Sequence, residues 1–222
     1  MKIFAHRGYS ARFPESTRAA YEGAVFARAD GFECDVRLTR DGEIVCFHDR
    51  TLKRNAGINK AVSRSTMKEL RSLVNAISLD ELLDIAIREK KDLLIETKHP
   101  VISGGKIELK VVDLLEKKRE AIKKSEINVT LMSFSYLALR RIKKVYPNVA
   151  KIIKYQLAAK FSKENQIALS IDIIIKKPKI IADKRSTRFF IWTVNNKTDI
   201  ELVSNLGVAG VITDEVELAK RD

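Results

Sequence analysis

The chain of 222 residues is long enough for one large α/β domain or two small ones, and its 45% of hydrophobic residues can form a sizeable core. Its formal net charge of +13 favours anionic partners such as phosphates, nucleic acids or lipid headgroups, without choosing among them. The N-terminus lacks the apolar run of a signal peptide and no stretch approaches the roughly 20 apolar residues of a membrane span, so we expect a soluble cytoplasmic protein without a transmembrane segment.

Strands and helices are predicted to alternate along the chain. Short runs rich in Ile, Val and Leu indicate the strands. Ser16 is a good N-cap for the first helix, and Thr66 and Ser78 each begin a capping box with a Glu three residues later. The predicted strands are residues 2–5, 31–38, 93–98, 129–134, 150–155, 171–175, 189–194 and 208–213, and the longer predicted helices are residues 17–29, 105–124 and 137–146.

Residues 33–49 are predicted to form a β-hairpin. Asp41-Gly42 is a strong signal for a two-residue turn in which both residues have positive φ. With that turn, Asp35 lies directly opposite His48. Because side chains alternate along a strand, Glu33 shares the face of Asp35. Two carboxylates and an imidazole crowded on one face serve no evident structural purpose, so they indicate a metal or a charged substrate.

The two cysteines, Cys34 and Cys46, belong to the two arms of this hairpin. In the predicted register they lie at offset positions and on different faces, so a disulfide is not expected. Two free thiols fit a reducing cytoplasm.

The number and spacing of the strands predict the fold class. Eight strands, nearly continuous in Ile, Val and Leu, are typical of parallel strands that are buried on both faces. Their alternation with helices predicts a compact (β/α)8 TIM barrel with a short hairpin insertion after the second strand, formed by residues 1–222 as a single domain. An open doubly wound sheet is the alternative, and it is weakened because no Gly-rich phosphate loop follows any strand.

Unusual polar residues stand where the predicted strands end, which is where a (β/α)8 barrel carries its active site. Two of the three histidines and the single tryptophan are among them. These residues are His6, Arg7, Glu33, Asp35, His48, Asp49, Glu96, Thr97, Lys98, Ser133, Phe134, Trp192, Asn195, Thr213 and Asp214.

Glu33, Asp35 and Glu96 form a carboxylate cluster on two neighbouring strands. All-oxygen ligation suits a hard divalent cation, Mg²⁺ or Ca²⁺, whereas zinc usually recruits histidine or cysteine. In an alternative interpretation the carboxylates form a structural ion-pair network with the basic residues Arg7, Arg37 and Lys98.

His6 and His48 are candidates for an acid–base pair at neutral pH. The guanidinium fork of Arg7 and the ammonium group of Lys98 suit phosphate oxygens. Trp192 either caps the barrel core or forms an apolar wall for a ligand.

Two further basic features are not assigned to the site. His99 follows Lys98 and is predicted to lie at the surface, pointing elsewhere. The run KKREAIKK, residues 117–124, is interpreted as a solvated helix face.

The chain resembles the glycerophosphodiester phosphodiesterase family over residues 3–219. The motifs that carry the resemblance are specific in combination. They are His6-Arg7-Gly8, Pro14-Glu15-Ser16-Thr17, Glu33-Cys34-Asp35-Val36, His48-Asp49 with the segment that follows, Glu96-Thr97-Lys98, Ser133-Phe134, Trp192-Thr193-Val194-Asn195 and Gly210-Val211-Ile212-Thr213-Asp214. Two departures are Ser16, where the family usually has Asn, and Glu215-Val216, where it has a residue followed by Pro.

The resemblance implies a barrel enzyme that hydrolyses glycerophosphodiesters, as small-molecule substrates, to an alcohol and sn-glycerol 3-phosphate with a divalent cation. The insertion after the second strand is minimal here. The implied roles are metal binding for Glu33, Asp35 and Glu96, acid–base catalysis for His6 and His48, substrate or phosphate contact for Arg7, Lys98, Phe134 and Trp192, and support of these groups for Glu15, Asp49 and Asn195.

The mechanism that we expect is in-line displacement at phosphorus. One histidine removes a proton from the nucleophile and the other protonates the leaving alkoxide. The nucleophile is either water or the free glycerol 2-hydroxyl, and the sequence leaves this choice open, as it does the head-group alcohol and whether the chain forms a homo-oligomer.

Two other functions are compatible with the sequence. A lysophospholipase D-like activity ranks lower because the short insertion shows no apolar lip. A non-catalytic basic barrel that binds nucleic acid or membrane also ranks lower, since only 7% of residues are aromatic and the catalytic motifs are intact. We therefore expect no nucleic-acid partner.

Overall fold

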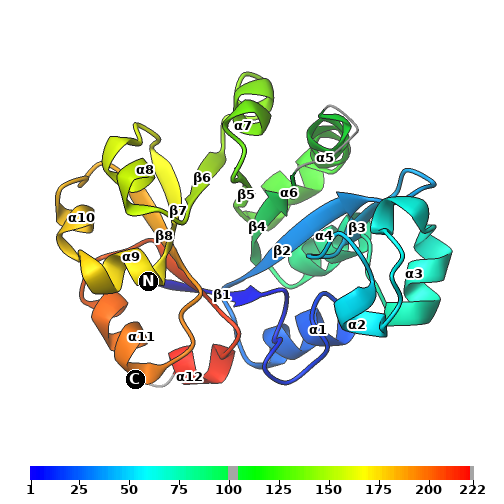
Figure 1. Cartoon of the computed structure of the whole chain (residues 1–222), viewed down its shortest axis with the longest axis horizontal. Coiled ribbons are helices and arrows are strands. Elements are labelled where there is room, and N and C mark those ends of the chain that lie inside the picture. The colour runs from blue at the N-terminus through cyan, green and yellow to red at the C-terminus, as the bar shows by residue number, and fades with distance from the viewer. Residues whose placement is uncertain (100–104, 221–222) are drawn as a thin grey trace.

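Eight parallel strands close into a barrel in this computed structural model, which describes residues 1–99 and 105–220. The strands are β1 (Lys2–His6), β2 (Gly31–Leu38), β4 (Asp92–Thr97), β5 (Val129–Ser133), β6 (Val149–Ile153), β7 (Gln166–Ser170), β8 (Arg188–Trp192) and β9 (Gly210–Thr213). β1 pairs with both β2 and β9, which closes the barrel (Figure 1). The predicted (β/α)8 fold is confirmed.

Helices surround the barrel. They are α1 (Arg18–Phe26), α4 (Leu79–Arg88), α5 (Lys106–Lys117), α6 (Arg119–Ser125), α7 (Tyr136–Ile142), α8 (Gln156–Phe161), α9 (Ile171–Lys176), α10 (Lys179–Ala182), α11 (Lys197–Ser204) and α12 (Val216–Lys220). None of the helices in the described ranges is long and apolar enough to cross a membrane.

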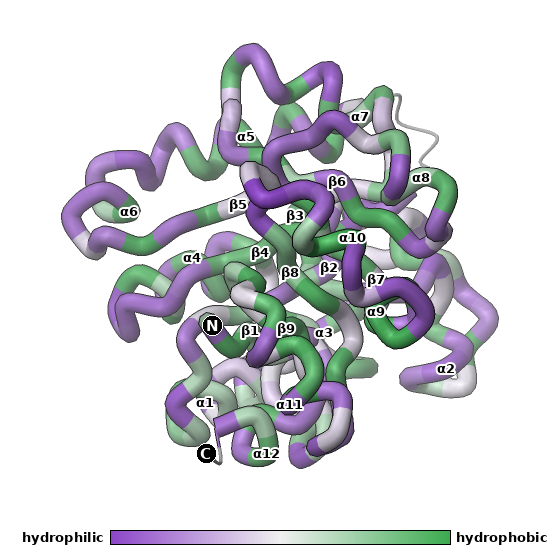
Figure 2. The backbone as a smooth tube through the Cα atoms, turned by 90° about the vertical axis from the view of Figure 1, so that its left-hand side faces the viewer, coloured by the Kyte–Doolittle hydropathy of each residue, from purple (hydrophilic) through white to green (hydrophobic). Residues whose placement is uncertain are grey.

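The strands separate two apolar layers, because alternate side chains point to opposite faces. The inner layer fills the barrel and includes Phe4 and Phe190, whose rings meet edge to face at 5.6 Å. The larger outer layer packs the strands against the helices. In Figure 2 hydrophobic tube follows central strands such as β8, while many of the outer turns are hydrophilic.

The segment between β2 and α4 forms a small lobe with its own apolar cluster. Its elements are β3 (Ile44–Cys46), α2 (Lys53–Ala56), the 3-10 helix η1 (Val62–Arg64) and α3 (Met67–Val74). The cluster is formed by Val45, Phe47, Leu52, Val62, Met67, Leu70 and Ala76. Both predicted capping boxes, at Thr66 and Ser78, are present. This lobe fixes the position of His48 relative to the barrel.

The hairpin of β2 and β3 is shifted by one residue from the predicted register. Val36 pairs with Cys46, and the Phe47 N–H donates to the carbonyl of Asp35 at 2.8 Å, so Asp35 does not face His48. The loop contains three residues between Thr39 and Glu43, which bond at 3.0 Å, and only Gly42 in it has positive φ (+81°). A three-residue loop ending in a left-handed Gly explains the shift.

The corrected register also relocates the two thiols. Cys46 opposes Val36, whose side chain shares a face with that of Cys34, so both cysteines lie in the outer apolar layer. The prediction that they occupy different faces was wrong. Both are nevertheless buried free thiols, as predicted.

Two predictions about helices and strands were wrong. The run at residues 171–175 is helix α9, because burial of Ile171, Ile173 and Ile174 satisfies a helical pattern and β7 lies just before it. The predicted helix at 105–124 is divided into α5 and α6 at Lys118.

The N-cap of α1 is Thr17, whose hydroxyl accepts from the Ala20 N–H at 3.2 Å. Ser16 has a left-handed φ of 57° and is not the cap.

Candidate active site

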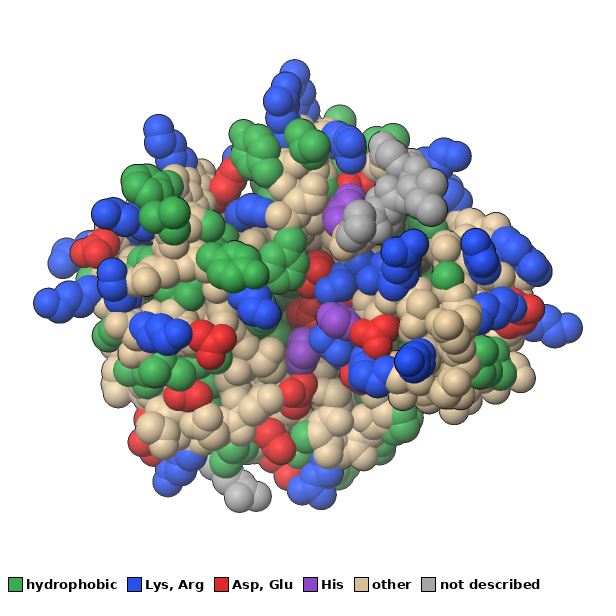
Figure 3. Space-filling view, in the orientation of Figure 1, with side chains coloured by type: hydrophobic (Ala, Val, Ile, Leu, Met, Phe, Trp, Pro, Cys, Tyr) green, Lys and Arg blue, Asp and Glu red, His purple; other side chains and the backbone are tan. Residues whose placement is uncertain are grey.

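The carboxyl ends of the strands enclose a cavity of about 230 Å³. It brings together nine of the residues that the sequence nominated. Those lining it are His6, Arg7, Glu33, Asp35, His48, Glu96, Lys98, Phe134 and Trp192. Figure 3 shows histidine, carboxylate and basic side chains gathered at the centre of this face.

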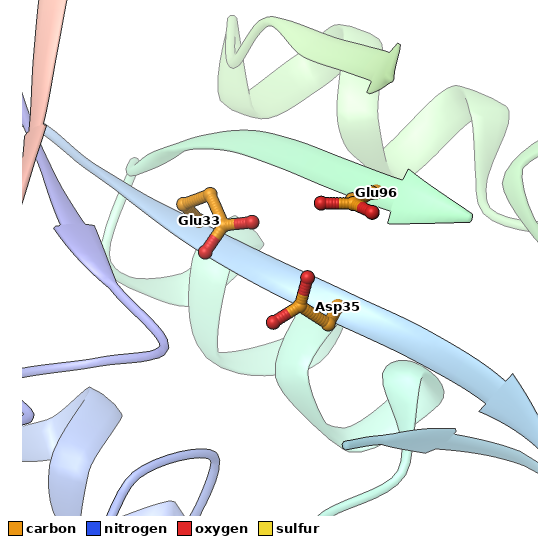
Figure 4. A group of neighbouring side chains, drawn as sticks. All are labelled: Glu33, Asp35 and Glu96. Atoms are coloured by element: carbon orange, nitrogen blue, oxygen red, sulfur yellow. The ribbon is translucent and has the colours of Figure 1, made fainter. Parts of the chain in front are cut away.

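The three carboxylates of the predicted cluster converge from two strands. Glu33 and Asp35 lie on one face of β2, and the strand register places Glu96 of β4 beside Asp35. Each of the three offers an oxygen within 4.8 Å of the others, and at most 8% of any of these residues is exposed. Figure 4 shows the three groups directed toward one another.

The electrostatics of this cluster favour an added cation. Burial raises the pKa of Glu33 well above its usual range and that of Glu96 to about 8. The pKa of Asp35 falls to about 2, because the charges of Lys98 and Arg7 outweigh its burial. Asp35 Oδ2 is buried and lies 3.0 Å from Arg7 Nε without meeting hydrogen-bond geometry. Three converging carboxylates, two of which are disfavoured from ionising by burial, fit a hard divalent cation, which prefers oxygen ligands.

Two basic side chains already partner the carboxylates. Lys98 Nζ lies 2.8 Å from Glu96 and 3.2 Å from Asp35. Arg7 Nε lies 3.0 Å from Asp35, and its Nη1 lies 3.1 Å from Glu15. The alternative of an ion-pair network is thus correct for these two residues, which also face the cavity.

Arg37, the third base of that network, is used differently. It donates from Nε and Nη2 to the backbone carbonyl of His48, at 3.0 and 2.8 Å. This bidentate bond fixes the end of the hairpin arm that carries the histidine.

His6 is oriented by Asp214, which the sequence placed at the rim of the barrel without a role. Its Nδ1 lies 2.6 Å from Asp214 Oδ1, and its Nε2 faces Glu33 at 3.9 Å. Asp214 also accepts from Ser10 and Asn195. Burial opposes ionisation of Asp214, but the bond to His6 prevails and its pKa falls to about 2. The Thr-Asp motif at the end of the last strand was the available sequence signal.

His48 is oriented in the same way by its neighbour. Its Nδ1 lies 2.6 Å from Asp49 Oδ1. Burial lowers the pKa of His48, and the charges of Lys98 and Arg7 add to this effect against the attraction of Asp35. His48 is therefore predominantly neutral at neutral pH.

Arg54 on α2 connects the two sides of the site and was not predicted. Its Nε lies 2.7 Å from Asp49, and its two terminal nitrogens donate to Glu15 at 3.0 and 2.6 Å. Glu15 in turn meets Arg7. Arg54 lies in the segment between the predicted hairpin and the helix that begins at Thr66, where the sequence shows no strand or helix period that would place a side chain in the site.

Aromatic side chains form the apolar wall of the cavity. The rings of Phe134 and Trp192 meet edge to face at 5.8 Å. Lys154, just beyond β6, also lines the cavity and was not predicted.

His99 is not at the surface, contrary to prediction. Its side chain is 16% exposed, and its Nε2 lies 2.9 Å from the fully buried Glu108 of α5. A buried carboxylate needs a partner. The prediction was wrong because helix α5, which carries Glu108, packs beside this strand end.

The fold and the cavity together define a (β/α)8 barrel enzyme whose site suits phosphodiester chemistry: two carboxylate-bound imidazoles, an acidic triad, and Arg and Lys beside it. Residues 6–218 match the model of the glycerophosphoryl diester phosphodiesterase family. A glycerophosphodiester phosphodiesterase of Caldanaerobacter subterraneus is 31% identical over 239 aligned positions, covering 97% of this chain and 94% of that protein. The chain therefore belongs to the glycerophosphoryl diester phosphodiesterase family.

Solved structures have the same fold. The glycerophosphodiester phosphodiesterase of Thermotoga maritima superimposes with a TM-score of 0.76 at 26% identity, covering 98% of this chain and 96% of that one. A phosphodiesterase of Oleispira antarctica, solved with its product sn-glycerol 3-phosphate, gives 0.76 at 20% identity, covering 99% and 95%. The second likeness, at this identity, shows the fold alone.

Proposed function

We propose that the chain hydrolyses glycerophosphodiesters to an alcohol and sn-glycerol 3-phosphate, with His6 and His48 as the acid–base pair. The observation that carries this proposal is the presence of two His–Asp pairs on one cavity that also contains the acidic triad. Family membership supports the same activity and argues against a non-catalytic basic barrel.

Each histidine is prepared for proton transfer at the same atom. When Nδ1–H donates to Asp214 or Asp49, the tautomer is fixed and Nε2 is left for the substrate. The neutral His48 can accept a proton, while His6 in its protonated form can donate one to the leaving alkoxide. The two residues then exchange these roles if the reaction passes through a cyclic phosphate formed by the glycerol 2-hydroxyl.

The basic residues supply charge where phosphoryl oxygens would lie. Arg7 and Lys98 hold fixed positive charges inside the cavity, which stabilise negative charge that develops during displacement. Glu33, Asp35 and Glu96 would hold a divalent cation, Mg²⁺ or Ca²⁺. When bound, such a cation adds positive charge and polarises the phosphoryl group.

The proposal is tested by assaying several glycerophosphodiesters, such as glycerophosphocholine and glycerophosphoethanolamine. Release of sn-glycerol 3-phosphate in step with the free alcohol supports it. Release of phosphocholine, or no turnover of any diester, would contradict it.

A second candidate, lysophospholipase D-like activity, gains from one observation. The apolar lip that the insertion lacks is present elsewhere, since Phe134, Tyr136 and Tyr155 are exposed just beyond β5 and β6. A long acyl chain would need such an entrance. Assaying lysophosphatidylcholine beside glycerophosphocholine distinguishes the two substrates. The cytoplasmic location is likewise a proposal, supported by the two free thiols.

A further inference from the structure

The positive charge of the chain is concentrated in one quarter of it. Residues 134–185 contain thirteen Lys or Arg and three Asp or Glu, a net charge of +10, whereas the remaining 170 residues contain 29 and 26, a net charge of +3. This quarter extends from the end of β5 through α10. The basic character that suggests an anionic partner is therefore a property of one side of the barrel.

The same quarter also exposes most of the large apolar side chains. Eight of the fourteen exposed large hydrophobic residues in the described ranges lie between 134 and 175. Tyr155, Leu157 and Phe161 are 73%, 71% and 68% exposed on or beside α8, and Tyr136 and Leu137 are about as exposed on α7. We call these five residues the rim patch.

The rim patch lies beside the mouth of the active-site cavity. Phe134, which lines the cavity, is two residues before Tyr136, and Lys154, which also lines it, directly precedes Tyr155. Figures 1 and 2 place α7 and α8 next to each other, and Figure 3 shows hydrophobic side chains over both helices with basic side chains around them. The patch thus shares the face on which the cavity opens.

Most of the basic side chains around the rim patch are not paired with a carboxylate. Among residues 134–185, all of them described, only Arg141 and Lys143 lie within ion-pair distance of a carboxylate. A groove of about 930 Å³ beside α8 is lined by five lysines and one carboxylate; the lysines are Lys160, Lys176, Lys177, Lys179 and Lys184.

The other basic run provides the contrast. In residues 117–124, Lys117, Lys118 and Arg119 pair with the carboxylates of Asp113, Asp80 and Glu116 at 2.8, 2.7 and 3.1 Å. Among the described residues, three of the five basic side chains of this run are thus paired, against two of the thirteen in residues 134–185.

We propose that the rim patch and the lysines around it dock the enzyme on an anionic lipid surface, with the cavity facing that surface. A bilayer accepts Tyr, Leu and Phe at its interface while its headgroups attract the surrounding lysines, and this combination is the one present here. A nucleic acid would complement the lysines but leave Leu137 and Leu157 without a partner. The proposal concerns binding alone and does not depend on which diester the cavity hydrolyses.

Sedimentation of the intact chain with lipid vesicles tests this docking, and it is read without any activity measurement. The vesicles are phosphatidylcholine alone, or phosphatidylcholine with about one-third phosphatidylglycerol. At low salt (~0.05 M) we expect at least about tenfold tighter binding to the anionic vesicles, and loss of that preference at ~0.5 M salt.

Two double variants separate the apolar and the electrostatic contributions. Leu157→Ser/Phe161→Ser and Lys176→Glu/Lys177→Glu should each weaken binding by about tenfold. The matched controls are Phe26→Ser/Leu109→Ser, exposed apolar residues of α1 and α5, and Lys123→Glu/Lys124→Glu on α6; both should bind as the wild type does. Unfolding midpoints check that every variant folds. If one of the two patch variants does not fold, the other still tests the proposal.

Several results would overturn the proposal. Failure of the wild type to sediment with anionic vesicles would contradict it. A loss of binding by the control variants as large as that of the patch variants would contradict it as well. Light scattering that showed a dimer dispersed by Leu157→Ser/Phe161→Ser, without vesicle binding, would assign the patch to a second copy of the chain. Binding to an oligonucleotide but not to vesicles would assign the lysines to a nucleic acid.

Discussion

At the scale of single residues, the site depends on two imidazoles whose Nδ1 atoms are each held by a carboxylate. Asp214 holds His6 and Asp49 holds His48, both at 2.6 Å. Asp49 directly follows His48, whereas Asp214 is 208 positions away from His6, and each carboxylate holds its ring at Nδ1. This common arrangement supports the proposal that two histidines 42 positions apart in sequence act as an acid–base pair.

Replacing either histidine should abolish most of the activity. We expect His6→Ala and His48→Ala each to lower kcat by about 10²- to 10⁴-fold, because a positioned acid or base contributes that much. Steady-state hydrolysis of glycerophosphocholine measures the effect, with His99→Gln as the matched control because His99 lies against Glu108. Retention of kcat within about tenfold by both alanine variants would remove the acid–base assignment.

Asp214 should also make the stability depend on acid pH. Its folded pKa of about 2 is below the unfolded value, so its contribution is present above pH ~4 and is lost as pH falls toward 2. Since its side chain is 31% exposed, we expect only about 1 kcal/mol from this group. Urea unfolding at pH 3, 5 and 7 should show a smaller difference in unfolding free energy between wild type and Asp214→Asn at pH 3 than at pH 5 or 7. A constant difference across this range would contradict the linkage.

At the scale of elements, the lobe between β2 and α4 completes the site. It carries His48, Asp49 and Arg54, and Arg54 ties this lobe to the barrel through Glu15. The ion pairs of Arg54 are half exposed, so their contribution to global stability should be small. Their contribution is instead to hold Asp49, and through it His48, in position.

Arg54→Gln should therefore impair catalysis more than stability. We expect about a tenfold loss in kcat with a shift in the unfolding midpoint of no more than about 3 °C. Arg64→Gln, an exposed arginine of η1 in the same lobe, is the control and should leave kcat unchanged. A large fall in the midpoint of Arg54→Gln, with kcat unchanged among the folded molecules, would show that the residue is only structural.

The sequence predicted the elements better than it predicted their detailed geometry. Capping boxes at Thr66 and Ser78 were identified because their signals are local. The hairpin register was not predicted correctly, because the loop that sets it makes a contact far along the chain. The carboxylate of Asp41 in this loop accepts from the Met67 N–H of α3 at 3.2 Å. Residues 171–175 were ambiguous for a related reason: a short apolar run suits a buried strand or a buried helix equally well.

At the scale of the whole molecule, barrel closure brings together residues that are far apart in sequence. His6 and Asp214 meet because β1 pairs with β9. The motifs therefore predicted nine of the residues that line the cavity and placed Asp214 at the same rim. They did not predict the contact of Asp214 with His6, or that Arg54 and Lys154 belong to the site. Those residues contribute through contacts that only the closed barrel and the folded lobe create.

The distribution of charge is also a property of the whole molecule, and the net charge alone does not show it. Of the net charge of +13, which favours anionic partners, +10 belongs to residues 134–185. Composition alone could not show that these lysines surround exposed aromatic and aliphatic side chains on the face of the cavity.

The most direct test of the account is hydrolysis of glycerophosphocholine before and after removal of divalent cations. We predict that chelation lowers kcat by at least about 100-fold, that Mg²⁺ or Ca²⁺ restores it, and that Glu33→Gln is not restored at the same cation concentration, since charged oxygen ligands hold the cation. Full activity in thoroughly chelated wild-type protein would contradict the assignment of Glu33, Asp35 and Glu96 as a catalytic metal site.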